Sequence, residues 1–109
     1  MNKVFVTQYI RGIDYSPLER WGEVIFLTDM EYPRDPSTED ERNKVMQQMD
    51  DNFWGKCDPE KDYIALTPSP IPNMLIGAMM TNMSNDVQTF NVLKWDNRKQ
   101  DYDVFTVEI

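Results

Sequence analysis

The polar side chains best suited to chemistry follow three short apolar segments of the sequence. Each segment ends in a threonine, at Thr7, Thr28 and Thr67. If the segments are parallel strands, their carboxyl ends meet at one edge of a sheet, where ligands of α/β proteins bind. The residues that make up this candidate ligand-binding site are Thr7, Gln8, Arg11, Thr28, Asp29, Thr67, Ser69 and Asn73.

These groups could hold a small anion of the nucleotide type. Asn73 is expected at the start of a helix, where N–H groups attract negative charge, and Arg11 adds a bidentate donor. However, prolines rather than glycines follow the third segment, so no glycine-rich phosphate loop is present. The alternative is that the hydroxyls only cap strand and helix ends, since threonine is in any case favoured in strands. Both interpretations stay open.

The residue types that most enzymes and metal sites need are scarce. The chain has no histidine and one cysteine, Cys57, which excludes a histidine-based triad, a multi-cysteine metal site and an internal disulfide. Lys56 lowers the pKa of a neighbouring thiol only modestly, so a catalytic Cys57 is not favoured. Asp29 and Glu31 could ligate Mg²⁺, but two carboxylates near a loop are common. We predict no metal and no cofactor, and we favour a non-catalytic role.

The elements that must position these groups can be read from hydrophobic patterns and capping signals. Continuous apolar runs predict strands over 4–8, 24–27 and 63–66. Ser16 followed by Pro17 and Glu19 predicts a short helix to Trp21, ended by Gly22. Longer helices are predicted from the cap Thr38 to Trp54 and from about residue 72 to residue 83, and alternating apolar residues predict a hairpin with strands over 90–95 and 105–109 around a polar turn.

This β-α-β-α-β-α-β-β order predicts one α/β domain over residues 1–109. We expect a small doubly wound, mostly parallel sheet with helices on both faces and an antiparallel C-terminal hairpin strand. The strand order 2-1-3-4-5 is the most economical one, because it places the continuous apolar runs of strands one and three at the centre. The alternative is an α+β domain whose hairpin forms a separate layer.

The charge of the chain bears on its partners. Eleven basic and 19 acidic residues give 11 − 19 = −8, which opposes direct binding to nucleic acid. A cationic protein partner, or mimicry of nucleic acid by surface carboxylates, is compatible with this charge. No apolar stretch approaches the ~20 residues that cross a bilayer, and no secretory signal is evident, so we expect a cytoplasmic protein without membrane contact.

Methionines raise the question of self-association. Six of the eight lie on the two longer helices, at residues 46, 49, 74, 79, 80 and 83. Methionine fills irregular cores, which is the default interpretation, and it also serves adaptable binding surfaces. Because a small domain has limited interior, we expect Met79, Met80 and Met83 to face a second subunit in part, as in a homodimer.

One segment resembles a known group of proteins. Leu93-Lys94-Trp95-Asp96, followed by Arg98 and Tyr102, is similar to the C-terminal end of small α/β proteins encoded by phages and their prokaryotic hosts. A strand-loop-helix like the one over residues 62–83 precedes that end, so the resemblance covers about the last 50 residues. It implies an accessory protein of phage or prokaryotic type and carries no established activity.

The sequence favours a small acidic, non-catalytic binding protein that holds a host factor or a small anionic ligand at the carboxyl ends of the strands. One alternative is an enzyme that processes a nucleotide or phosphate compound, with Asp29 as base and Arg11 as charge stabiliser. Another is an acidic inhibitor that mimics nucleic acid. A ligand binder would lose its ligand on Arg11→Ala or Ser69→Ala, whereas a mimic would bind a basic protein with steep salt dependence.

Overall fold

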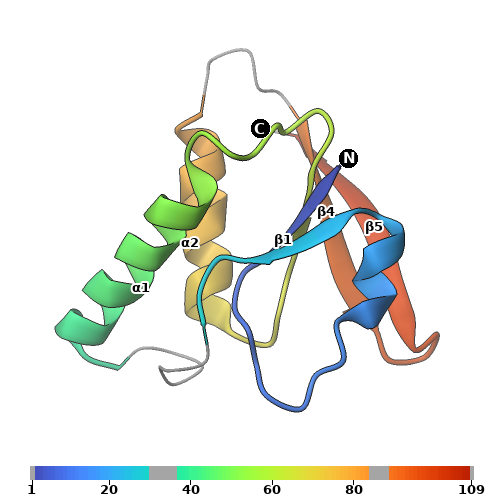
Figure 1. Cartoon of the computed structure of the whole chain (residues 1–109), viewed down its shortest axis with the longest axis horizontal. Helices are drawn as coiled ribbons and strands as arrows, with labels where there is room; N and C mark the ends of the chain where they lie inside the picture. Colours follow the sequence, from blue (N-terminus) through green and yellow to red (C-terminus); the bar gives the residue numbers. More distant parts are fainter. Residues whose placement is uncertain (1, 30–36, 84–88, 109) are drawn as a thin grey trace.

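The structure, a computed structural model, describes residues 2–29, 37–83 and 89–108. Its centre is a single five-stranded sheet with the order β2-β1-β3-β4-β5 (Figure 1). The strands are β1 (Lys3–Val6), β2 (Glu23–Phe26), β3 (Tyr63–Ala65), β4 (Thr89–Asp96) and β5 (Asp101–Glu108). The first four run parallel, and β5 pairs antiparallel with β4. The predicted α/β fold, strand order and C-terminal hairpin are confirmed.

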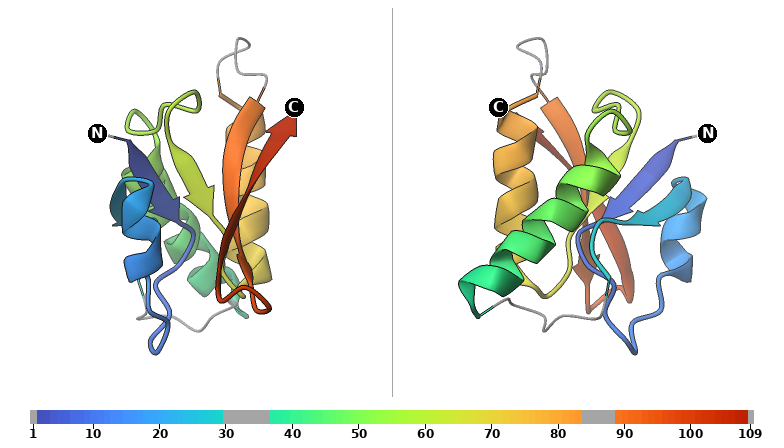
Figure 2. Two further views of the ribbon diagram at one scale, coloured as in Figure 1. Left: turned by 90° about the vertical axis from the view of Figure 1, so that its right-hand side faces the viewer. Right: turned by 60° about the vertical axis from the view of Figure 1, so that its left-hand side comes forward.

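Helices cover the two faces of the sheet unequally. The helices α1 (Glu39–Phe53) and α2 (Pro70–Thr81) lie side by side on one face, and the short 3₁₀ helix η1 (Ser16–Arg20) lies on the other (Figure 2). The first predicted helix is a 3₁₀ helix of five residues. The loop predicted between residues 29 and 37, including Glu31, falls mostly outside the described residues.

Each face of the sheet has its own apolar core, which is why the central strands read as continuous apolar runs. On the α1/α2 side, Phe5 packs edge-to-face against Phe53 with ring centroids 5.9 Å apart. On the η1 side, Val4 and Val6 join a cluster with Leu18 of η1 and Tyr102 of β5. The hairpin therefore belongs to the same sheet and core as the parallel strands, which excludes the alternative with a separate layer.

The start of α1 confirms the predicted N-cap at Thr38, and the start of η1 corrects the predicted cap at Ser16. Thr38 accepts a hydrogen bond from the N–H of Glu41 at 3.1 Å, and its hydroxyl contacts the carboxylate of Glu41 at 3.1 Å. Ser16 is not a cap: it is the first residue of η1, and its N–H donates to Asp14 at 2.9 Å. In this short 3₁₀ helix, the carboxylate of Asp14 takes the place expected for the serine hydroxyl.

The start of α2 also differs from the prediction. The helix begins at Pro70 rather than at residue 72 or 73, and Ser69 occupies its N-cap. A serine at this position usually accepts a hydrogen bond from the second or third helical N–H. The third helical residue is Pro72, which has no N–H to donate, and the buried Ser69 hydroxyl has no hydrogen-bond partner among the described residues. The helix ends at Thr81, two residues before the predicted end.

Candidate functional site

The three strand-end threonines meet, as the strand order requires. The hydroxyls of Thr7 and Thr67, at the ends of β1 and β3, lie 2.9 Å apart. Thr28, which follows β2, donates its hydroxyl to the backbone carbonyl of Thr7 at 2.9 Å. All three side chains are buried, with at most 9 % of their surface exposed. They form a polar cluster beneath the surface at the carboxyl ends of the strands.

Asn73 completes this threonine cluster. It lies in the first turn of α2, and its side-chain oxygen accepts hydrogen bonds from the Thr7 hydroxyl at 2.8 Å and the Thr67 N–H at 3.3 Å. Its amide nitrogen donates to the Thr67 carbonyl at 2.7 Å. The amide thus ties the helix to the ends of β1 and β3. These hydrogen bonds are directed within the cluster, as the capping interpretation expects.

The start of α2 offers few donors for an anion. Pro70 and Pro72 have no N–H, and the N–H of Asn73 donates to the Ser69 carbonyl at 3.3 Å. An anion site at a helix start needs several convergent N–H groups. The prolines therefore make the anion site predicted from the sequence less favourable. Binding of an anion by Ser69 and Asn73 stays a prediction.

The two charged residues of the predicted site lie at its periphery. Arg11 is exposed and forms no ion pair within the described residues. Asp29 is exposed as well, and Gln48 of α1 donates to its carboxylate at 3.4 Å and accepts from its N–H at 3.3 Å. Gln8 is buried, and its backbone carbonyl accepts from the Tyr15 hydroxyl at 3.2 Å.

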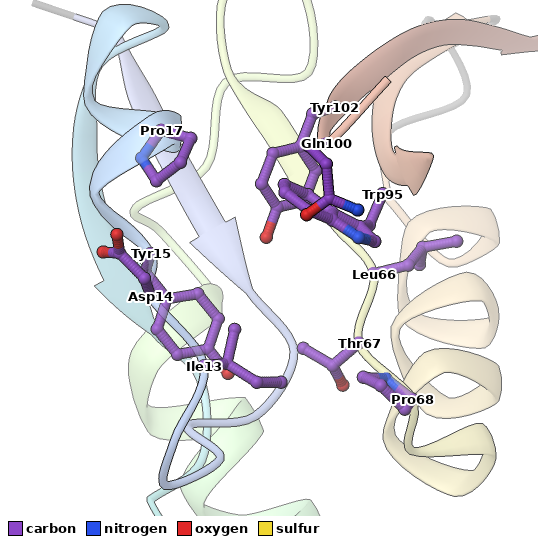
Figure 3. Close-up of a pocket in the computed structure, with 10 residues that line it drawn as sticks. All are labelled: Ile13, Asp14, Tyr15, Pro17, Leu66, Thr67, Pro68, Trp95, Gln100 and Tyr102. Carbon is purple, nitrogen blue, oxygen red and sulfur yellow. The ribbon is translucent and has the colours of Figure 1, made fainter. Parts of the chain in front are cut away.

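A pocket of about 480 Å³ opens on the η1 side of the same sheet edge (Figure 3). It lies between the loop that precedes η1 and the β4–β5 hairpin, and the segment after β3 forms its base. Its lining residues are Ile13, Asp14, Tyr15, Pro17, Leu66, Thr67, Pro68, Trp95, Gln100 and Tyr102. Thr67 is the one residue that this pocket shares with the predicted site.

Aromatic rings form the hairpin wall of the pocket. Trp95 and Tyr102 pack edge-to-face with centroids 5.1 Å apart, and the indole N–H of Trp95 donates to Asn97 at 2.8 Å. The Tyr102 hydroxyl is directed into the pocket toward Tyr15 (Figure 3) and makes no hydrogen bond to the described residues. Burial raises the pKa of Tyr102 to about 12, so this hydroxyl is a neutral donor near neutral pH.

The wall opposite the hairpin, formed by the loop that precedes η1, is held in place by hydrogen bonds. The Tyr15 hydroxyl accepts from the Ile10 N–H at 3.0 Å and donates to the Gln8 carbonyl. Hydrogen bonds from Ser16 lower the pKa of Asp14, which keeps this carboxylate ionised near neutral pH. Asp14 is the one lining residue with a formal charge at that pH, and its exposed carboxylate points away from the aromatic wall (Figure 3).

Two contacts connect η1 and the residue after it to the hairpin. Arg20 forms an ion pair with Asp101 at 2.9 Å and stacks on the Trp21 ring at 3.8 Å. Trp21 in turn packs edge-to-face against Tyr102, with centroids 6.4 Å apart. These contacts hold η1 against the hairpin and so fix the separation of the two walls.

The sequence contained a signal for this pocket that the site prediction did not use. The segment that carries the phage-protein resemblance includes Trp95, at the end of the first predicted hairpin strand, and Tyr102, which precedes the predicted start of the second. They are cross-strand neighbours in the structure. Aromatic residues paired at the end of a hairpin are a plausible pocket wall, but their role depends on what packs opposite them.

Cys57 has a poorly reactive thiol. Burial, together with the carboxylates of Asp62 and Asp58, raises the pKa of its thiol to about 12. A thiol that stays protonated is a poor nucleophile, in agreement with the view that Cys57 is not catalytic.

We expect iodoacetamide to alkylate Cys57 in the folded protein at pH 8 roughly a thousandfold more slowly than an unperturbed thiol, because the thiolate fraction is that much smaller. Intact-mass spectrometry over time measures the rate. Alkylation at the rate of glutathione would contradict the expectation, and the same reaction in concentrated urea is the control for access.

The described residues contain no group of three or more acidic or thiol side chains arranged to hold a metal ion. Within the same parts of the chain, no helix is long and apolar enough to cross a membrane.

Comparison with known proteins gives one match. The sequence profile of a family described as Phage Pam3 gp32-like protein matches residues 2–109. The match spans nearly the whole chain, so the phage relationship extends well beyond the last 50 residues that first indicated it. No curated protein and no solved structure matches the chain.

Proposed function

The chain belongs to the Phage Pam3 gp32-like protein family, and we propose that it acts there as a small, non-catalytic binding protein whose ligand occupies the pocket between η1 and the hairpin. The observation that carries this proposal is the pocket itself. Its volume of about 480 Å³ falls within the range of small-molecule sites, and it lies at a carboxyl strand end of a doubly wound sheet.

The lining favours a ligand with a flat apolar body. Trp95 and Tyr102 present rigid aromatic surface, and Ile13, Leu66 and Pro68 extend the apolar area. Aromatic surfaces of this kind bind flat rings by stacking and edge-to-face contact, and little side-chain entropy is lost because the rings are already held. The hydrogen bond from Trp95 to Asn97 supplies that prior ordering.

The polar groups favour a neutral or cationic end on that ligand. Asp14 places an exposed carboxylate at the outer rim, and Tyr102 and Gln100 add a neutral hydroxyl and an amide (Figure 3). The net charge of −8 adds a field that repels anions. The small ligand that we propose is therefore cationic or neutral, in place of the anionic one expected from the sequence.

The distribution of ionisable groups supports binding over catalysis. The ionisable residues that line the pocket are Asp14, Tyr15 and Tyr102. Both tyrosines belong to the buried core, and the Tyr15 hydroxyl is already hydrogen-bonded on both its donor and acceptor sides. Asp29 and Arg11, proposed from the sequence as base and charge stabiliser, do not line this pocket.

Two indole probes of opposite charge test the proposal. We expect tryptamine to shift the backbone amide resonances of Thr67, Gln100 and Tyr102 in ¹H–¹⁵N spectra, and indole-3-acetate to bind more weakly, because the exposed Asp14 carboxylate and the net negative charge repel its carboxylate. Asp14→Asn should remove most of this difference. Tyr102→Phe, which keeps the ring, should weaken both probes.

Asp29→Asn is the matched control, because it makes the same change in net charge outside the pocket. It should leave the preference for tryptamine intact. The proposal fails if neither probe shifts these resonances, or if Asp29→Asn and Asp14→Asn alter the preference equally. Turnover of a nucleotide that depends on Asp29 and Arg11 would establish the enzyme alternative instead.

A further inference from the structure

The outer edge of β5 is a long strand edge that nothing described in the chain covers. β5 pairs with β4 and lies at the end of the sheet (Figures 1 and 2). All five residues from 104 to 108 are exposed, and the large apolar side chains of Val104, Phe105 and Val107 are 46 %, 50 % and 38 % exposed. This apolar surface is independent of the pocket, whose lining comes from the other end of the hairpin.

The two edges of the sheet differ in a way that singles out β5. The opposite edge strand, β2, spans four residues, whereas β5 spans eight. Natural proteins protect long edges with lysine, proline, bulges or short strands, because unpaired N–H and C=O groups recruit another strand. From Val104 to Val107 the β5 edge contains no lysine or proline and consists of three apolar residues and a threonine. Such an edge is suited to pairing with a further strand.

We propose that the strand which pairs with this edge is β5 of a second copy of the chain. Two copies related by a two-fold axis pair antiparallel, and the backbone hydrogen bonds match only when one residue lies opposite its own copy. In a register centred on Thr106, Phe105 of each copy lies opposite Val107 of the other copy. The two sheets then join into one continuous sheet across the axis.

Charge and polarity select this register and favour a second copy. It places Thr106 opposite itself, where threonine pairs are favourable, and Val104 opposite Glu108, so no two carboxylates are opposed between residues 104 and 108. Centring on Phe105 instead would set Val107 against Asp103, which is ion-paired with Lys99 at 2.7 Å. Centring on Asp103 would oppose two carboxylates. The register centred on Thr106 is therefore more favourable than those centred on Phe105 or Asp103.

The structure also argues against the helical dimer surface expected from the sequence. Met80 is 1 % exposed and belongs to the core, and Met79 and Met83 pack against that core. Met74 is the most exposed of the large apolar residues described, at 72 %, and it belongs to α2 rather than to β5. Met74 therefore provides the control for the edge-pairing proposal.

A cysteine placed at the two-fold axis tests both the dimer and its register. In Thr106→Cys the two α-carbons would lie about 4.5–5.5 Å apart, within the range that a disulfide spans. In Val104→Cys they would be separated by four residue steps of about 3.4 Å each, which is too far. Under a mild oxidant at about 100 µM protein, we expect most of Thr106→Cys and little of Val104→Cys to form a covalent dimer on a non-reducing gel. The native Cys57 is common to both variants.

Sedimentation gives an independent readout without new cysteines. We expect the unmodified chain to dimerise with concentration and Phe105→Glu to weaken the dimer at least tenfold, because two added carboxylates face the apolar side chains across the axis. Met74→Glu should leave the dimer unchanged. A chain that stays monomeric at about 300 µM overturns the proposal, since weak specific pairs are half-formed well below that concentration. Equal crosslinking of the two cysteine variants, or dissociation by Met74→Glu alone, also overturns it.

Discussion

Replacing Asn73 by alanine should lower the free energy of unfolding by about 3 kcal/mol, because the substitution removes three hydrogen bonds at a buried cluster. The Thr67 N–H and carbonyl and the Thr7 hydroxyl would each lose their contact with the Asn73 amide. Leaving a buried polar group unsatisfied costs more than the hydrogen bond itself contributes, and water can replace these partners only partly. The urea midpoint should fall by about 2 M, since a domain of this size has a slope near 1.5 kcal/mol per M.

Asn52→Ala is the matched control for this measurement. Asn52 also lies in a helix, α1, and its side chain donates one hydrogen bond, to the Leu27 carbonyl at 3.0 Å. Both substitutions gain the same helix propensity, so the difference between them isolates the additional hydrogen bonds of Asn73. We expect Asn52→Ala to cost about 1 kcal/mol. Equal effects of the two variants would contradict the view that the Asn73 amide holds the strand ends together.

The threonine cluster and the pocket are adjacent parts of one sheet edge, and Thr67 belongs to both. Its hydroxyl and backbone are engaged with Thr7 and Asn73, while the residue also lines the pocket beside Leu66 and Pro68. The cluster therefore holds the base of the pocket in place. If the pocket binds the ligand proposed above, these strand-end polar groups support binding indirectly, although their hydrogen bonds are made within the protein.

The positions of the four parallel strands could be predicted from the sequence because their signals are local, whereas β5 begins at Asp101, four residues before its predicted start. Continuous apolar runs mark strands buried on both faces, and crossover connections between such strands dictate parallel pairing. The convergence of Thr7, Thr28 and Thr67 follows from that topology alone. The start of α2 was harder to place, because Pro68-Ser69-Pro70-Ile71-Pro72 fits both a broken loop and a helix whose first turn lacks donors.

The pocket could not be predicted in the same way, because its walls come from segments far apart in the chain. Tyr15 and Tyr102 face each other only after η1 has packed on the sheet and the hairpin has folded back along β3. Neither segment has a motif that reveals the other. The β5 edge lies between these two extremes of predictability. Alternating apolar residues predicted a strand there, but its exposure could be seen only once the strand order was known.

Gly22→Ala should be among the most destabilising single substitutions in the chain, with a cost of about 3 kcal/mol or more. Gly22 joins η1 to β2 with a φ of +156°, in a region that alanine rarely adopts. A methyl group at this position would also overlap the backbone carbonyl of Asn2, which accepts the Glu23 N–H at 2.9 Å. Backbone cannot yield as a side chain does, so relief requires the start of β1 to separate from β2.

For Gly77→Ala, which makes the same chemical change, we expect the opposite effect on stability. Gly77 lies within α2, and a methyl group there would meet no atom within 4 Å. Alanine should therefore stabilise the protein by up to about 1 kcal/mol through helix propensity. Urea denaturation of both variants should show midpoints displaced in opposite directions, and amide exchange in Gly22→Ala should rise first at Lys3 and Glu23. If Gly22→Ala unfolds at the midpoint of the unmodified chain, then the close approach of Asn2 to Gly22 does not hold β1 and β2 in register.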